Sequence, residues 1–487
     1  MTTKKAKRRQ YGAFVRRVKD FIAVYKNSKL GMAGAIMLFL FIFFAIAAPL
    51  LTPYEPIKDT YLADSVAMPL WMTMVPEYKN APRTTENKFN ASDWTIDESS
   101  LNSNYFEVMQ KNDRLIVQFP KVIDVLKENE THELMMVVNF DYPYDPPSTF
   151  NIKFELKTTI IGEADYAIDL FLKTPSGINY NLWNIEGMNQ GNASIKAVID
   201  SRDIPLKMRL GLDPLSNLAK TIFSEKGEYE LVFKISSGQL NKGDECRLDF
   251  SKINLKILGE VHGLLGTDHV GSDIFSQLIY GTRISLLIGI LAALLSISIG
   301  LLVGLIAGYY GSFVDETLMR IVDILLSIPG LALLMVLVTF LGKNIWNIIL
   351  LLGILGWMGF ARASRSQVLS LKERTFVEAS RALGASNKRI MFRQILPNVM
   401  PLVFATLVLS IPGAILTESA LSFLGLGDPR ISSWGRILYN AYSFGGFSKL
   451  AWWWILPPGL AITILSLSFV FIGHALDEIL NPRLRKR

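Results

Sequence analysis

The sequence predicts an α-helical membrane protein with six transmembrane helices and a mostly-β extracellular domain inserted after the first of them. Three observations predict this fold. Apolar residues make up 50% of the 487 residues, and many of them are gathered into long uninterrupted runs typical of segments surrounded by lipid. Residues 53–260 have the opposite texture, with frequent charges and short alternating stretches. Both ends of the chain are strongly basic, and the formal net charge is +7.

Residues 1–30 are the predicted cytoplasmic N-terminal segment, with ten Lys or Arg residues and one acid, Asp20. Basic ends can bind nucleic acid, but beside an apolar run they fit the retention of Lys and Arg on the cytoplasmic side of a membrane. Residues 31–52 are the predicted first transmembrane helix, because Gly31–Leu51 carries no charge and about 31 Å of helix crosses a bilayer. A cleaved signal peptide is the alternative, but the run is too long and Pro49 fits a cleavage site poorly.

The insertion, residues 53–260, is predicted to be a mostly-β sandwich outside the cell. Residues 150–157 and 229–235 alternate apolar and polar side chains, the period of half-buried strands, and residues 174–177 favour a turn. Sequons at Asn90, Asn129 and Asn192 support an outside location weakly. The chain has one cysteine, Cys246, which excludes an internal disulfide and is interpreted as a small buried residue.

Residues 261–480 are predicted to form a five-helix core, followed by a basic cytoplasmic tail at 481–487. The apolar runs lie at about 284–309, 324–341, 345–361, 399–421 and 451–473. Six crossings place both basic ends inside the cell and residues 53–280 outside. They also place the loop 362–398 inside, and this loop carries eight Lys or Arg residues against two acids. Three charge patterns therefore favour one topology.

The loop 362–398 has the capping residues of two short helices joined by a sharp turn. Thr375 and Glu378 are predicted to form a capping box, Gly384 to end the first helix, Ser386 to cap the second, and Pro397 to begin the next crossing. Apolar residues follow one face of each helix, which implies a groove on a partner protein: Phe376, Ala379, Ala382 and Leu383 in the first, and Ile390, Met391 and Ile395 in the second.

The pattern Glu378-Ala-Ser-X3-Gly384, followed by Leu396-Pro397, resembles the EAA loop of the permease subunits of ABC importers. Further motifs are similar to those of the C-type dipeptide and oligopeptide permeases: 265–273, 280–286, 422–427, 433–436, 455–459 and 481–484. Gln394 stands where the general EAA pattern has Ile, and Ser272 replaces a usual Arg. The resemblance covers residues 1–55 and about 260–487 and leaves out the insertion.

The resemblance implies six helices of the importer permease type, in a subunit that forms half of a translocation path for peptides. The implied partners are a second homologous permease subunit, two ATP-binding subunits and an extracytoplasmic substrate-binding protein. ATP and Mg would be bound by the ATP-binding subunits, and no cofactor or metal is expected in this chain. The implied ATPase-coupling residues are Glu378, Ala379, Ser380, Arg381, Ala382, Leu383, Gly384, Ala385 and Ser386.

Other features allow competing interpretations. Gly342-Lys343-Asn344 lacks the glycine and hydroxyl residue of a phosphate-binding loop. Glu418, Pro412 and Pro329 are candidates for the translocation path or for gating, although Glu418 can also bond a neighbouring serine and the prolines can serve packing. Asp323 is a weaker candidate, near a membrane surface. Asp268, His269 and Asp273 are interpreted as a solvated outer surface rather than a metal site.

Two other classes of function are considered, namely a membrane-anchored ligand sensor and a membrane enzyme. A sensor lacks an output domain in the short C-terminal segment, and no pattern of catalytic residues favours an enzyme. Within the importer class, oligosaccharides or nickel are alternative substrates. The insertion is predicted to dock the substrate-binding protein, with a spacer role as the alternative.

Overall fold

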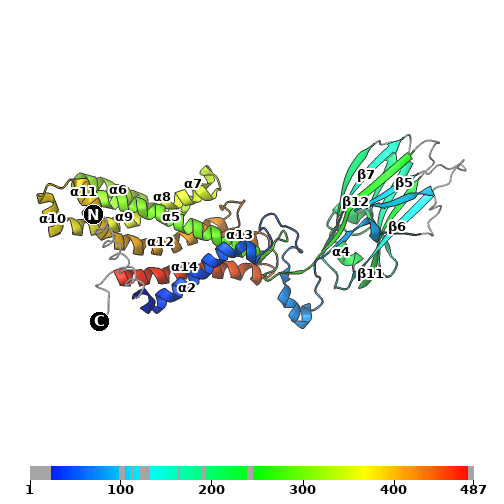
Figure 1. Cartoon of the computed structure of the whole chain (residues 1–487), viewed down its shortest axis with the longest axis horizontal. Helices are drawn as coiled ribbons and strands as arrows, with labels where there is room; N and C mark the ends of the chain where they lie inside the picture. The colour runs from blue at the N-terminus through cyan, green and yellow to red at the C-terminus, as the bar shows by residue number, and fades with distance from the viewer. Residues whose placement is uncertain are drawn as a thin grey trace, which may run out of the picture. The chain divides into compact units, whose positions relative to one another are not determined.

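The computed structural model describes residues 24–97, 105–111, 113–119, 132–161, 165–188, 192–237 and 245–480. Contacts divide the chain into two compact units: a helical unit, Met1–Asp59 with Asp273–Arg487, and a β unit, Thr60–Ser272 (Figure 1). The β unit thus begins and ends later than the expected bounds of 53 and 260. Residues 1–23 and 481–487, with most of the predicted basic ends, lie outside the described residues.

The bounds of the β unit shift because its first and last segments bond to each other. The backbone N–H groups of Tyr61 and Leu62 donate to the carbonyls of Val270 and Gly271, at 3.0 and 2.9 Å. Strand β1 (Met68–Pro69) also pairs in parallel with β13 (Val261–His262). Residues 261–272, expected in the helical core, therefore belong to the β unit.

The β unit is a sandwich of two antiparallel sheets around one apolar core. One sheet has the order β10 (Ala193–Asp200), β7 (Thr149–Ile161), β12 (Glu245–Leu258), β5 (Arg114–Phe119) and β4 (Glu107–Lys111), with β2 (Thr85–Phe89) also paired to β12. The other has the order β3 (Thr95–Ile96), β6 (His132–Tyr142), β11 (Gly227–Ser237), β8 (Asp165–Lys173) and β9 (Asn179–Met188). The short helices α3 (Ile204–Arg209) and α4 (Leu218–Ile222) lie in the connections.

The alternating patterns predicted the central strands correctly. Residues 150–157 lie in β7 and residues 229–235 in β11, and every second side chain of both is buried in the shared core. The predicted turn joins β8 to β9, where the N–H of Gly177 donates to the carbonyl of Thr174 at 2.9 Å. Of the sequons, Asn90 and Asn192 are exposed, and Asn129 falls outside the described residues.

Within residues 24–59 and 273–480 of the helical unit, four helices are long and apolar enough to cross a membrane, and two bent pairs bring the total to as many as six. The long helices are α2 (Lys29–Leu51), α5 (Ile274–Tyr310), α12 (Leu396–Phe423, joined without a break to the preceding turns from Asn387) and α14 (Trp452–Leu480). The bent pairs are α6 (Ser312–Ser327) with α7 (Gly330–Leu341), and α8 (Ile345–Gly356) with α9 (Met358–Lys372).

The sequence did not predict the bends. The runs 324–341 and 345–361 were each expected to form one crossing, but α6 and α7 meet at 85° and α8 and α9 at 40°. The first bend lies at Ile328–Pro329, because proline disfavours a helical conformation in the residue before it and cannot donate a backbone hydrogen bond. The helix α13 (Trp434–Ser443) was not predicted either.

We expect Cys246 to report unfolding of the β unit. Its side chain is fully buried on β12, and burial raises the pKa of the thiol to about 12, so almost no reactive thiolate forms at neutral pH. A maleimide dye should leave the folded full-length chain unlabelled at pH 7.5 and react fully in denaturant, measured by mass spectrometry. Rapid labelling of the native chain would contradict the described packing of β12.

Candidate coupling surface and membrane core

Helix α10 (Thr375–Ala382) starts without the predicted capping box. Arg374 is the N-cap in an extended conformation, and no side chain accepts a capping hydrogen bond. Thr375 is already the first helical residue, so its hydroxyl does not occupy the position from which a cap bonds the third N–H. Glu378 is instead an exposed acid in the first turn, where the helix dipole favours a negative charge.

The turn after α10 is built on Gly384, as the sequence predicted. Gly384 has φ +78°, and two backbone bonds close the helix end: Gly384 N–H to Arg381 O at 3.0 Å, and Ala385 N–H to Ser380 O at 3.1 Å. A Cβ atom at Gly384 would meet no atom within 4 Å. The glycine is therefore required by its backbone conformation and not by crowding.

Helix α11 (Asn387–Ile390) follows with Ser386 as the N-cap residue, although the Ser386 hydroxyl makes no capping bond. The Tyr309 hydroxyl at the end of α5 bonds the Asn387 side chain at 2.7 Å. From Asn387 the helical path continues through a π-helical turn, Met391–Ile395, into α12, with Pro397 in its first turn. The turn at Gly384 is thus joined to α12 without an intervening loop.

The two apolar stripes predicted for the loop behave differently. The first is exposed on α10: Leu383 is 88% and Phe376 38% exposed, and Ala379 and Ala382 are also exposed. The second stripe was wrongly predicted to face a partner. Ile390, Met391 and Ile395 are buried in a core with Val377 and residues of α5, α9 and α12. Helical periodicity located the stripe but did not indicate which protein covers it.

The predicted coupling residues form one continuous surface around the Gly384 turn. Seven of them are exposed, and Ser380 and Ala385 are half-buried. Phe392, in the π-helical turn, is 50% exposed and was not predicted as part of this surface. The surface has a bare aromatic ring, an exposed leucine and basic side chains, which suits a groove with apolar walls and acidic groups.

Glycines at every fourth position hold α5 against α9. A Cβ atom on Gly304 would lie 1.9 Å from Ser364 Oγ and 2.6 Å from the Ala361 carbonyl oxygen, and Gly300 and Gly308 are similarly crowded by α9. The Ser364 hydroxyl donates to the Gly300 carbonyl at 3.1 Å across this contact. The spacing of small residues, which permits close helix packing in membranes, was the signal available in the sequence.

Glu418 lies in the interior of α12 and is only 2% exposed. Its carboxylate accepts a hydrogen bond from Ser422 Oγ at 2.7 Å, and Ser422 Oγ lies 3.5 Å from the hydroxyl of Ser433, the N-cap of α13. The bonding of a neighbouring serine, the simpler of the two interpretations, is therefore what the structure contains. The Glu418 group fastens α12 to the start of α13.

The three candidates for a path do not share a site. A cavity of about 360 Å³ between α7 and α12 is lined by Gly330, Leu331, Leu334, Leu416, Thr417 and Ala420. Pro329 is exposed at the bend beside this cavity, whereas Pro412 and Glu418 are buried in α12, and none of the three lines it. A translocation role thus remains a prediction for all three.

Two ion pairs join α6 to α9. Arg362 binds Asp323, and Arg365 binds Asp315 through two bonds, one of them 2.5 Å long. The charge of Asp323 is therefore balanced by a base on the neighbouring helix. These pairs hold α6 in place while α7, beyond the bend, packs against α8 through Leu334 and Val338.

Asp428 connects the loop after α12 to the start of α8. Its buried carboxylate accepts bonds from the Arg430 guanidinium at 2.9 and 3.0 Å and from the N–H of Ile345, and Arg430 holds the pKa of Asp428 below its usual range. Asp268 and Asp273 were wrongly interpreted as solvated, because both are buried: the Asp268 carboxylate accepts bonds from backbone N–H groups within the β unit, and Asp273 caps α5. No group of three metal-binding side chains occurs among the described residues.

Residues 300–486 match the family described as binding-protein-dependent transport system inner membrane component, and residues 17–69 match the N-terminal transmembrane domain of oligopeptide transport permease C. The chain is 40% identical over 245 residues to the oligopeptide transport system permease protein OppC of Bacillus subtilis, covering 49% of this chain and 79% of that protein. The chain belongs to this family of transport permeases.

This permease is also 38% identical over 225 residues to the dipeptide transport system permease protein DppC of Bacillus subtilis, covering 45% of the permease and 69% of the relative. A solved chain of the MetNI methionine ABC transporter shares 22% identity with a TM-score of 0.34, covering 43% of the permease and 97% of that chain. The resemblance to C-type peptide permeases is confirmed. Neither of the two matching families is an ATP-binding domain.

We expect Gly304→Ala to loosen the contact between α5 and α9. The new methyl group overlaps the backbone of α9, so the helices must separate, at a cost of about 1–3 kcal/mol. The midpoint temperature of unfolding of the purified permease in detergent should fall. Gly413→Ala, where a Cβ meets no atom within 4 Å, is the matched control and should leave that temperature unchanged or higher. Equal effects of the two variants would contradict the packing.

Proposed function

We propose that this permease forms one transmembrane half of an ATP-driven importer of peptides, with ATP hydrolysis on separate subunits. The observation that carries the proposal is the family match over residues 300–486, which includes the Gly384 turn, together with relatives that are oligopeptide and dipeptide permeases. The remaining membrane surface of the path comes from a second homologous permease subunit. Two ATP-binding subunits, which hold ATP and Mg, and an extracytoplasmic substrate-binding protein complete the assembly.

The exposed surface around Gly384 is the contact with an ATP-binding subunit in this proposal. Leu383 and Phe376 enter an apolar groove, and Glu378 and Arg381 pair with charges at its rim. When the ATP-binding subunits close, they displace α10 and α11. The buried contacts of Val377 and Ile390, and the bond from Tyr309 to Asn387, pass this displacement to α5 and α12 as a rigid-body tilt.

The topology in this proposal has six crossings, with each bent pair counted as one. The N- and C-terminal segments and the coupling surface then lie in the cytoplasm, and residues 53–280 lie outside. Support comes from the eight Lys or Arg residues in the loop 362–398 and from the basic ends. A bent crossing suits a path, because non-helical backbone at membrane depth is tolerated where it borders protein or water.

We predict that Gly384→Pro uncouples transport. Proline fixes φ near −65° and has no N–H, so the left-handed turn and its bond to the Arg381 carbonyl are lost. Peptide uptake by proteoliposomes containing the complete complex should fall at least about tenfold, a loss of 1.4 kcal/mol or more in coupling. Replacing Glu378 together with Ala379 by bulky residues should have the same effect. Gly413→Ala is the control that should retain uptake.

The uncoupling experiment also tests the class of protein. ATPase subunits and ATPase activity should co-purify with the unaltered permease. A membrane sensor or an enzyme that acts alone would not bring them down. Full ATP-driven uptake by Gly384→Pro would remove the coupling role from this turn. If the complex imports oligosaccharides or nickel and not peptides, the proposal of an ATP-driven importer stands and only the proposed substrate is wrong.

We predict that Arg381→Cys is protected from an impermeant maleimide in intact cells and labelled in inverted vesicles. The new thiol lies on the exposed coupling surface, and the single native cysteine, Cys246, is buried and contributes no background. Asn90→Cys, exposed in the β unit, should show the reverse pattern. Labelling of Arg381→Cys from outside would refute the topology.

A further inference from the structure

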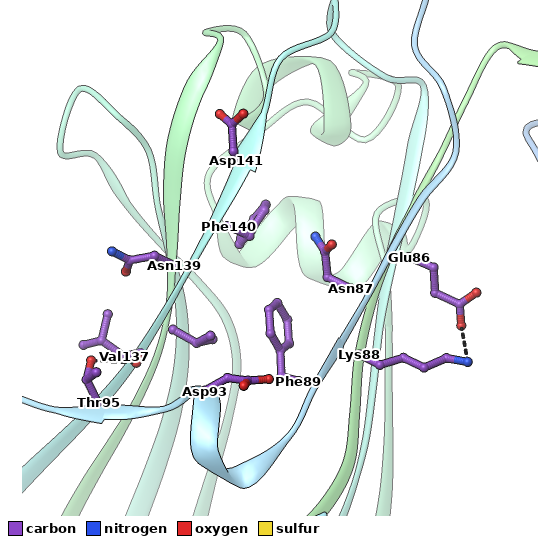
Figure 2. Close-up of a pocket in the computed structure, with 11 residues that line it drawn as sticks. Glu86, Asn87, Lys88, Phe89, Asp93, Thr95, Val137, Asn139, Phe140 and Asp141 are labelled. Carbon is purple, nitrogen blue, oxygen red and sulfur yellow. Dashed lines mark hydrogen bonds and ion pairs between the residues drawn. The ribbon is translucent and has the colours of Figure 1, made fainter.

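The β sandwich has an open seam between strand β2 of one sheet and strand β6 of the other. Here the two strands border a groove of about 620 Å³, with Asn87 and Phe89 on one side and Asn139, Phe140 and Asp141 on the other (Figure 2). This volume lies within the range of peptide and small-molecule sites. No part of the coupling function uses this groove.

The seam is open because the segment between β2 and β3 does not pair with β6, and the chain first meets the edge of β6 at β3. Strand β3 covers β6 only at Met136 and Val137. Before β3, residues Ala91–Asp93 form a 3₁₀ turn held by a reciprocal capping box between Asn90 and Asp93, and this turn carries the chain across from β2 to β3. Among the described strands, none pairs with the outer edge of β6 from Asn139 to Tyr142.

The alternation of a strand shows which main-chain groups face the groove. The carbonyls of Met135 and Val137 accept bonds from the β3 side, from Asp97 N–H at 3.0 Å and from Thr95 Oγ1 at 3.1 Å. Because successive residues of a strand direct their N–H and C=O groups to opposite sides, those of Asn139 and Asp141 face the same side, beyond the end of β3. The groove therefore offers two donors and two acceptors in the register of a β ladder.

The walls of the groove combine an apolar floor with a negative rim. Phe89 and Phe140 lie side by side on the floor, with ring centroids 6.3 Å apart. Around them are three carboxylates, on Glu86, Asp93 and Asp141, against one base, Lys88, which pairs with Glu86 at 3.5 Å. Asp93 is engaged in its capping box, and no hydrogen bond or ion pair joins the Asp141 carboxylate to another described residue.

We propose that this seam binds an extended peptide by β-strand addition, and that Asp141 receives its N-terminal ammonium group. The inference rests on the proposed function, because it takes the imported class of molecule as the ligand. The peptide continues the line of β3 antiparallel to β6, which places its N-terminus beside Asp141. Four residues opposite Asn139–Tyr142 span about 14 Å, and one side chain in two enters the groove over Phe89 and Phe140.

A peptide fits these groups better than an oligosaccharide does. Sugar rings stack on exposed aromatic faces, whereas Phe140 is only 8% exposed and Phe89 is packed against the core. Unpaired main-chain groups at a strand edge recognise another main chain, and a carboxylate at the end of that edge recognises a free amino terminus. The seam thus recognises the main chain and the amino terminus, which all peptides share, and its binding depends little on peptide sequence.

The test is equilibrium binding to the full-length permease in its complex, reconstituted in nanodiscs without the substrate-binding protein. The probe is the tetrapeptide Val-Thr-Val-Thr with a free amino terminus and a dye at the carboxyl end, followed by fluorescence polarisation. Asn139→Pro removes the outward N–H while sparing the bonds to β11, and should weaken binding about tenfold. Asn139→Ala keeps the N–H and loses only the side-chain bond to Glu228, so binding should change less than about twofold.

Charge is tested separately. Asp141→Lys should weaken binding about tenfold, and Glu186→Lys, the same charge change at an exposed site on β9, should not. N-acetylation of the probe should weaken binding to the unaltered protein by a similar factor, which keeps the proposal falsifiable even if a variant fails to fold. Equal affinity of the acetylated and free probes, or of Asn139→Pro and Asn139→Ala, would overturn it. Saturable binding of maltohexaose in place of the tetrapeptide would overturn it as well.

The outcome separates this proposal from the proposed function. If Asp141→Lys abolishes binding of the tetrapeptide while the complex still imports peptides, the seam is a peptide site and the importer function also stands. If the unaltered complex imports peptides but shows no saturable binding of the tetrapeptide, only the seam proposal fails. If the tetrapeptide binds at the seam but the complex transports no peptide, the seam proposal stands and the proposal that the importer carries peptides fails.

Discussion

In the proposed function, coupling depends on one buried core beneath the Gly384 turn. Val377, Ile390 and Ile395 are fully buried there against α5, α9 and α12, and each such side chain contributes about 1.5–3 kcal/mol by leaving water. A loop held only at its ends would absorb a displacement by bending. We expect the turn and the membrane helices to move together, because this core and the continuous helical path from Asn387 to Phe423 connect them without a flexible segment.

The sequence predicted the parts of the fold that follow from lipid contact and from strand alternation. Apolar runs located the long helices and the bent pairs that are apolar enough to cross a membrane, and a period of two located β7 and β11. Gly384 was predicted with its conformation, because few other residues adopt φ +78° easily. The capping box failed because Thr375 lies inside the helix rather than before it, a shift of one residue that capping patterns alone do not resolve.

Features that depend on neighbours were beyond the sequence. Hydropathy treats the run 324–341 as uniform, but the bend at Pro329 turns α7 away from α6, and the ion pairs of Asp315 and Asp323 then fix α6 on α9. Ile390 and Ile395 looked available to a partner because a helical stripe does not say what it packs against. The bond from Ser422 to Glu418 likewise depends on the packing around α12, and the path role predicted for Glu418 stays a prediction.

The seam of the β unit raises a question of how an open strand edge persists. Exposed edges recruit other strands and aggregate unless charge or brevity protects them. On β6 the open edge, Asn139–Tyr142, carries the Asp141 carboxylate near its end, and the 3₁₀ turn at Ala91–Asp93 borders the groove at the end where β3 begins. A second sheet would meet this turn and the unpaired carboxylate, whereas a short peptide with a cationic end would not. The protection of the edge and the selectivity proposed for it thus have the same physical origin.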